Sequence, residues 1–253
     1  MGGGDDELIT ALKSGKVIKP ATVDPAAHAR QAEVRRRAAR GTEFFQNKQY
    51  AEAETEYRAA LRLDPKDADL HAGLGVAVGK KGDLNGALKE LREALRLDPN
   101  NDHVLVELGN TLGLVGDWDG AIAEYHQALR LDPNNDKAHV FLGVALATKG
   151  DANSAIAECR AGLRLNPNSA DAHMALGIVL GLKGDWDGDI AEQQEALRLN
   201  QNSPTEHFLL GLAREAKGDR QGALGEYRAA YMLDPQNATY KQNYERLLQQ
   251  MNK

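Results

Sequence analysis

The sequence has little cysteine and no long apolar run. Only one of its 253 residues is a cysteine, Cys159, so no disulfide can form within the chain. No segment approaches the roughly 20 apolar residues that a membrane-spanning helix needs. The start, Met1 to Asp6, lacks the basic region and the apolar core of a secretory signal peptide. These absences predict a cytoplasmic protein with no membrane partner, unless a targeting segment has been removed from the start.

The motifs that build catalytic or cofactor sites are also missing. The sequence contains no P-loop, no HExxH helix, no nucleophile elbow and no paired-cysteine motif. Without an activated nucleophile or an acid–base pair, we expect no enzymatic activity, no catalytic residue, no cofactor and no metal site.

Positive charge is scarce in most of the chain. The net charge is −6, and residues 1–40 hold eight basic and five acidic residues, which leaves a net charge of −9 in the remainder. An acidic surface argues against nucleic acid as a partner, because contacts to phosphates require basic residues. The basic run at 35–37, with Arg30 and Arg40, is more typical of a solvated helix face than of a binding site.

The main feature that the sequence does contain is a repeat. The dipeptide Gly-Asp recurs five times at intervals of 34 residues, beginning at Gly82, Gly116, Gly150, Gly184 and Gly218. A fixed period of this length is typical of a solenoid, in which each unit covers its apolar face by stacking on its neighbours. Counting back from the recurring prolines gives six units, which are 34–67, 68–101, 102–135, 136–169, 170–203 and 204–237.

Each unit is predicted to hold two helices, as the unit 102–135 illustrates. Leucines at spacings of three and four residues predict the apolar face of its first helix. We expect Gly116 to end that helix with a positive φ and Asp117 to cap the next one. Gly109 and Ala121 are small, which allows the two helices to approach closely. Pro133 should end the second helix, because proline disfavours helical geometry in the residue before it.

This pattern resembles the tetratricopeptide repeat (TPR). In the unit 102–135 the resemblance is carried by Leu105, Leu108, Gly109, Leu112, Gly116, Ala121, Tyr125, Ala128 and Pro133. It covers about four-fifths of the chain. It implies an all-α fold, a right-handed α-solenoid of six helix-turn-helix units, and a concave groove lined by the first helix of each pair.

The two ends are predicted to differ from the six repeats at 34–237. Residues 1–33 are expected to form an extension with a short helix at 5–14, a linker, and the start of a long helix from Pro25 that Asp24 caps. Residues 238–253 are predicted to form a closing helix whose outer face is polar, as the last unit of a solenoid requires.

Four histidines and the single cysteine occupy positions that favour packing. His71, His139, His173 and His207 share one place in their units. A zinc ion would need its ligands to converge, whereas neighbouring helix axes lie roughly 8–10 Å apart, so we interpret these histidines as packing residues. Cys159 occupies the place of an aromatic residue or a leucine in other units, which predicts a buried thiol.

The resemblance places ligand contacts on the first helix of each unit, at its second, fifth, sixth, ninth, twelfth and thirteenth residues. In this chain these places form an apolar stripe, a pattern typical of a binding or self-association surface. The candidate peptide-binding residues are Val76, Val106, Asn110, Val140, Phe141, Val144, Met174, Ile178, Phe208 and Leu212. Glycine at the twelfth place, as at Gly113 and Gly181, is expected to leave room for a large ligand.

The same places argue against one ligand of related domains, the EEVD tail of heat-shock chaperones. The resemblance implies that basic and amide groups clamp the carboxylates of such a tail. The matching residues in this chain are Ala38, Thr42, Gly73, His103 and Glu107. They include no lysine or arginine, and Glu107 would repel an acidic tail, so we expect no such binding.

Three functions remain open. The first is a scaffold or adaptor that holds an apolar peptide or an amphipathic helix of a partner protein in the groove. The second is a self-assembling structural protein, a homo-oligomer in which the helix at 5–14 or an exposed end fills the groove of a neighbour. The third is the non-catalytic arm of a larger enzyme.

The fifth unit departs from the repeat pattern. Asp189 replaces the small alanine of other units, and Gln193 replaces the aromatic residue. Because a buried carboxylate is costly unless it is paired, we expect the second helix of this unit to be the least stable of the stack.

Overall fold

The computed structural model describes residues 24–252, which form thirteen α-helices and, in this range, no strand. The helix predicted at 5–14 lies outside the described residues. The helices from α2 to α13 form six pairs, and α14 follows the last pair. Their bounds are α2 (Pro25–Gln46), α3 (Tyr50–Leu61), α4 (Ala68–Lys80), α5 (Leu84–Leu97), α6 (Asp102–Leu114), α7 (Trp118–Leu131), α8 (Asp136–Thr148), α9 (Ala152–Leu165), α10 (Ala170–Leu182), α11 (Trp186–Leu199), α12 (Pro204–Lys217), α13 (Arg220–Leu233) and α14 (Ala238–Met251).

Glycine and aspartate build the turn inside five of the pairs, as predicted. The glycines of the five Gly-Asp pairs have φ between 79° and 96°, a left-handed conformation that only glycine adopts at little cost. The aspartate that follows caps the next helix. In the third pair, Oδ1 of Asp117 accepts from the backbone N–H of Gly120 at 2.9 Å.

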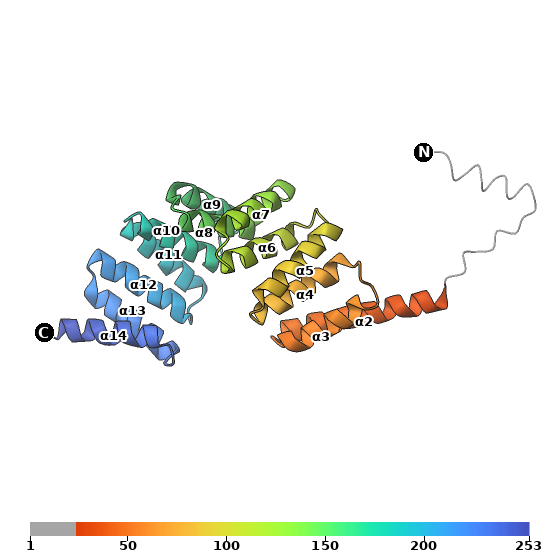
Figure 1. Cartoon of the computed structure of the whole chain (residues 1–253). Coiled ribbons are helices and arrows are strands. Elements are labelled where there is room, and N and C mark those ends of the chain that lie inside the picture. The colour runs from red at the N-terminus through yellow and green to blue at the C-terminus, as the bar shows by residue number, and fades with distance from the viewer. Residues whose placement is uncertain (1–23, 253) are drawn as a thin grey trace, which may run out of the picture.

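The first helix of each pair lies on the concave side of the molecule. Figure 1 shows the pairs following one another along a curved row that begins at α2 and ends at α14. Successive first helices contact each other, from α2 with α4 to α10 with α12. Within the described residues, no comparable contact joins successive second helices. Because the helices are closer together on one side, the row bends toward that side, and the first helices line the hollow.

Small residues let the two helices of a pair touch, as the sequence predicts. A Cβ added to Gly109 would lie 2.5 Å from Cε1 of Tyr125, and Ala121 is fully buried. In the fourth pair, Cys159 takes the place of Tyr125 and is also fully buried. Burial raises the pKa of its thiol to about 11, so Cys159 is a protonated core residue at neutral pH.

The ends of the described range are capped. The carboxylate of Asp24 accepts from the backbone N–H of Ala26 at 3.0 Å, with Pro25 at the first position of α2. At the other end, α14 packs against α13 and buries Tyr240 and Leu247. None of the helices in the range 24–252 is long and apolar enough to cross a membrane. The expected fold class is confirmed, since the chain is an all-α helical repeat.

Candidate functional site: the groove of the first helices

An exposed apolar row runs along the concave face. It consists of the ninth residue of three successive units, Val144 on α8, Ile178 on α10 and Leu212 on α12, which are 38%, 39% and 39% exposed. Two leucines at the thirteenth place, Leu114 on α6 and Leu182 on α10, are 72% and 68% exposed. Apolar side chains that gather on one face, instead of lying scattered, are typical of an interaction surface.

A cavity of about 520 Å³ opens around α6 and α8. Four of the candidate residues line it, namely Val106, Asn110, Val140 and Phe141. Val106 and Val140 are only 5% and 6% exposed, so they form its floor. The rest of its lining is polar and is made of Lys80, His103, Glu107, Asp132, Asn134, Asn135, Asp136, Lys137, Asn166, Ser169 and Asp171. The cavity therefore offers an apolar floor and a polar rim, the combination that ligand pockets use for affinity and orientation.

Tyr125 orients the amide of Asn110 in this cavity. Its hydroxyl donates to Oδ1 of Asn110 at 2.8 Å, and burial raises the pKa of Tyr125, which keeps the hydroxyl protonated as a donor. The Nδ2 group of Asn110 is thus left to donate to a ligand. Thr42 and Tyr57 form the corresponding contact at 3.1 Å in the first unit.

The remaining three candidates belong to neither the row nor the cavity. Val76 packs against the core formed by the second, third and fourth pairs, and Met174 is half-buried on α10. Phe208 packs against Tyr227 and Tyr240, with ring centroids 5.7 and 5.0 Å apart. These half-buried side chains expose less surface to a ligand than the row of Val144, Ile178 and Leu212 does.

Glycine at the twelfth place was predicted to leave room for a large ligand, and this prediction is wrong for Gly113 and Gly181. A Cβ added to Gly113 would lie 2.9 Å from Cζ3 of Trp118, and one added to Gly181 would lie 2.5 Å from Oδ2 of Asp189. Both glycines are buried. The chain folds back a few residues after each glycine. Side chains of the second helix therefore fill the space beside the glycine, which the pattern of the first helix alone does not reveal. These glycines serve helix packing.

The four histidines that share one place link the two helices of their own pair. Nδ1 of each ring lies 2.6–2.7 Å from a glutamate oxygen 19 residues later, in the pairs His71–Glu90, His139–Glu158, His173–Glu192 and His207–Glu226. In three of them Nε2 also lies within 3.2 Å of a proline carbonyl in the preceding turn. Sequence reasoning predicted packing but missed the glutamate. The constant spacing between histidine and glutamate was the available signal.

Polar side chains occupy the core of the fifth pair and its junction with the sixth. Asp189 is 7% exposed and Gln193 is 1% exposed. Nε2 of Gln193 donates to Oδ1 of Asp189 at 3.2 Å and to the carbonyl of Met174 at 3.3 Å. Among the residues from 24 to 252, Oε1 of Gln193 and Oε2 of the buried Glu206 have no hydrogen-bond partner. The departure from the repeat in sequence is therefore also a departure in packing.

Sequence comparison relates the repeats to a known family. Family models described as TPR repeat or tetratricopeptide repeat match residues 41–82, 80–116, 115–179 and 155–204. A search of curated protein sequences found no significant match.

Solved structures of other proteins share the fold. PilF of Pseudomonas aeruginosa is 20% identical with a TM-score of 0.72, and the alignment covers 88% of this chain and 99% of that one. PilW, a type IV pilus biogenesis factor, is 18% identical with a TM-score of 0.76, at 85% and 98% coverage. A chain of the APC/C complex Cut9–Hcn1 is 18% identical with a TM-score of 0.79, but this chain spans only 43% of its length. At these identities the likeness concerns the fold alone.

Proposed function

Because the chain belongs to the tetratricopeptide repeat family, we propose that it is a scaffold that binds an apolar peptide or amphipathic helix of a partner protein in its concave groove. Proteins of this family serve in general as protein-interaction scaffolds without chemistry of their own.

The observation that carries the proposal is the row Val144, Ile178 and Leu212. The three residues sit at the same place on successive first helices and have nearly equal exposure. An extended peptide or a helix laid along the groove would contact all three in turn, which is the helix-in-groove mode of recognition. The cavity with Asn110 at its wall would then receive one side chain or a backbone carbonyl of the same ligand.

The test is to place a carboxylate in the row. We expect Val144→Glu and Ile178→Glu each to weaken partner binding at least about tenfold, because burying an unpaired charge against an apolar ligand costs more than about 1.4 kcal/mol. The measurement is an affinity pull-down from the native cell, followed by titration of the partner that is recovered. Circular dichroism should show that both variants keep their helical fold.

Leu165→Glu is the matched control. Leu165 is 40% exposed, about as exposed as Val144 and Ile178, but it ends the second helix α9 and does not line the groove cavity. If both groove variants retain the partner as the wild type does, or if Leu165→Glu abolishes binding equally, the groove is not the binding surface.

Self-association is a second candidate, favoured by apolar exposure at the C-terminal end. Met232 and Leu233 at the end of α13 are 67% and 43% exposed, and Met251 of α14 is 37% exposed. A copy docking on this end would cover them. The check is the mass in light scattering over a range of concentrations. A monomer throughout would remove this function, whereas a dimer that Met232→Glu dissociates would support it.

A further inference from the structure

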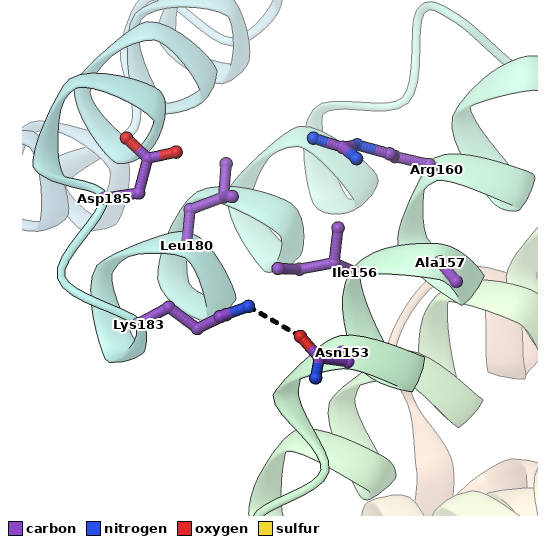
Figure 2. Close-up of a pocket in the computed structure, with 7 residues that line it drawn as sticks. All are labelled: Asn153, Ile156, Ala157, Arg160, Leu180, Lys183 and Asp185. Carbon is purple, nitrogen blue, oxygen red and sulfur yellow. Dashed lines mark hydrogen bonds between the residues drawn. The ribbon is translucent and has the colours of Figure 1, made fainter.

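A second cavity, of about 440 Å³, lies on the side of the second helices, between α9 and the turn that joins α10 to α11. Figure 2 shows its lining, with the apolar side chains of Ile156 and Leu180 between Arg160 on one side and Lys183 on the other. We call this cavity the outer pocket, and define it by Asn153, Ile156, Ala157, Arg160, Leu180, Lys183 and Asp185. It shares no residue with the groove cavity.

Neither cation of the outer pocket is neutralised by a carboxylate. Nζ of Lys183 donates to Oδ1 of Asn153, a neutral amide, at 2.6 Å. Arg160 is exposed and, within the described part of the chain, forms no ion pair or side-chain hydrogen bond. The one carboxylate, Asp185, is already engaged as the N-cap of α11 and accepts from the backbone N–H of Gly188 at 3.0 Å.

The neighbouring junctions show that this charge pattern is specific to one place. One repeat earlier, the equivalent lysine, Lys149, pairs with Asp119 at 3.0 Å. One repeat later, Lys217 pairs with Asp187. In that later pocket the place of Leu180 is taken by Arg214, which lies 3.6 Å from Glu226. Among these three junctions, the one between the fourth and fifth repeats differs in two ways. Asn153 replaces the aspartate, and Arg160 lies beside an apolar floor.

We propose that the outer pocket binds an acidic side chain, and an apolar side chain next to it, from an exposed segment of a partner protein. The carboxylate lies between Arg160 and Lys183, where charge-assisted hydrogen bonds from both cations reach it. The apolar side chain covers Ile156 and Leu180. A free phosphate would fit less well, because it leaves the apolar floor uncovered and places more negative charge beside Asp185. This surface is independent of the groove and would let the scaffold hold two partners at once.

The test uses two capped dipeptides and the isotope-labelled full chain. N-acetyl-Asp-Leu-amide is titrated and followed by the NMR shifts of backbone amides, with N-acetyl-Asn-Leu-amide as its neutral match. We expect the Asp peptide to shift signals from residues 153–160 and 180–185 in a saturable way. The Asn peptide should bind about threefold to fivefold more weakly, the range expected when exposed ion pairs are lost.

Two variants separate the pocket from general electrostatics. Asn153→Asp restores the ion pair that neighbouring repeats have and is not expected to disturb folding. It should lower the affinity for the Asp peptide to that for the Asn peptide. Asn100→Asp adds the same charge in an exposed turn and should leave both affinities unchanged. The proposal is overturned if the two peptides bind equally, if shifts arise elsewhere or do not saturate, or if Asn153→Asp has no more effect than Asn100→Asp.

Discussion

At residue 189 the chain has a carboxylate where the other five repeats have alanine. Those alanines, Ala53, Ala87, Ala121, Ala155 and Ala223, are all fully buried. Burial raises the pKa of Asp189 to about 6, with Gln193 lowering it by hydrogen bonding and Asp185 raising it further. The folded protein therefore binds a proton here more tightly than the unfolded chain, in which the pKa is about 3.9. Stability from this residue falls as pH rises from about 4 to about 6 and then levels off.

The change Asp189→Ala should therefore stabilise the protein, by roughly 1–3 kcal/mol at pH 7 and by less at pH 4, since the penalty of the charged form is removed. The measurement is urea unfolding at a series of pH values. Asp119→Ala is the control, because Asp119 is exposed and its loss should change stability little at any pH. A wild type whose stability rises between pH 4 and pH 6 relative to Asp189→Ala would contradict this account.

Single residues also show how far the sequence could be read. The burial of Asp189 and Cys159 was predictable, because each breaks a repeat whose other members define the place as core. The filling of space beside Gly113 by Trp118 was not, because it depends on how the second helix folds back. The contact between Lys183 and Asn153 spans 30 residues and two repeats. The only signal in the sequence is a comparison of the repeats, in which Asn153 stands where the neighbouring repeats have the aspartate that pairs with the lysine.

At the scale of helices, we predict that the fifth pair is the weak element of the stack. In the other pairs the second helix contributes an alanine together with tyrosine, leucine or cysteine to the core of the pair, whereas α11 contributes Asp189 and Gln193. Within the described residues Oε1 of Gln193 is unpaired, and an unpaired buried oxygen costs about 1–3 kcal/mol, so we expect α11 to open locally more easily than its neighbours.

Hydrogen exchange should reveal this difference helix by helix. We expect the amides of α11 to exchange fastest among the second helices α5, α7, α9, α11 and α13, with α9 and α13 as the nearest comparisons in the same stack. The variant Asp189→Ala should restore part of the protection. If α11 is the best protected of these helices, the polar core is not a weakness.

The helix scale is also where the sequence predicts most. In five of the six pairs the period, the glycine and the aspartate specify where the helices begin and end, because these are local effects repeated every 34 residues. The exposure of the groove residues is harder to predict from the sequence than the helices are. Val144, Ile178 and Leu212 are exposed, but Val106 and Val140 are buried by contacts between neighbouring units, which the pattern of one helix does not contain.

At the scale of the whole molecule, the contacts between helices are local, within a pair and between adjacent pairs. The two helices of a pair contact each other most, adjacent pairs contact each other next, and no helix in the described range contacts one at the far end of the row to a comparable extent. Stability is then a sum of units and interfaces, and damage at one end should remain local. Within the described residues, α14 is the only helix that covers the side of the sixth pair facing away from the other repeats.

Deletion of residues 238–253 tests this additivity. It removes the fully buried Leu247 and the nearly buried Tyr240, together with the pair in which Arg246 Nη2 lies 2.7 Å from Glu215. Burial of a large apolar side chain contributes about 1.5–3 kcal/mol, so the sixth pair should lose roughly 3–6 kcal/mol. Hydrogen exchange should then become faster in α12 and α13. The increase should be smaller toward α10, and exchange in α4 to α7 should not change. A uniform loss of protection over all pairs would mean that the solenoid folds as one cooperative block, and that the groove cannot be altered at one repeat without disturbing the others.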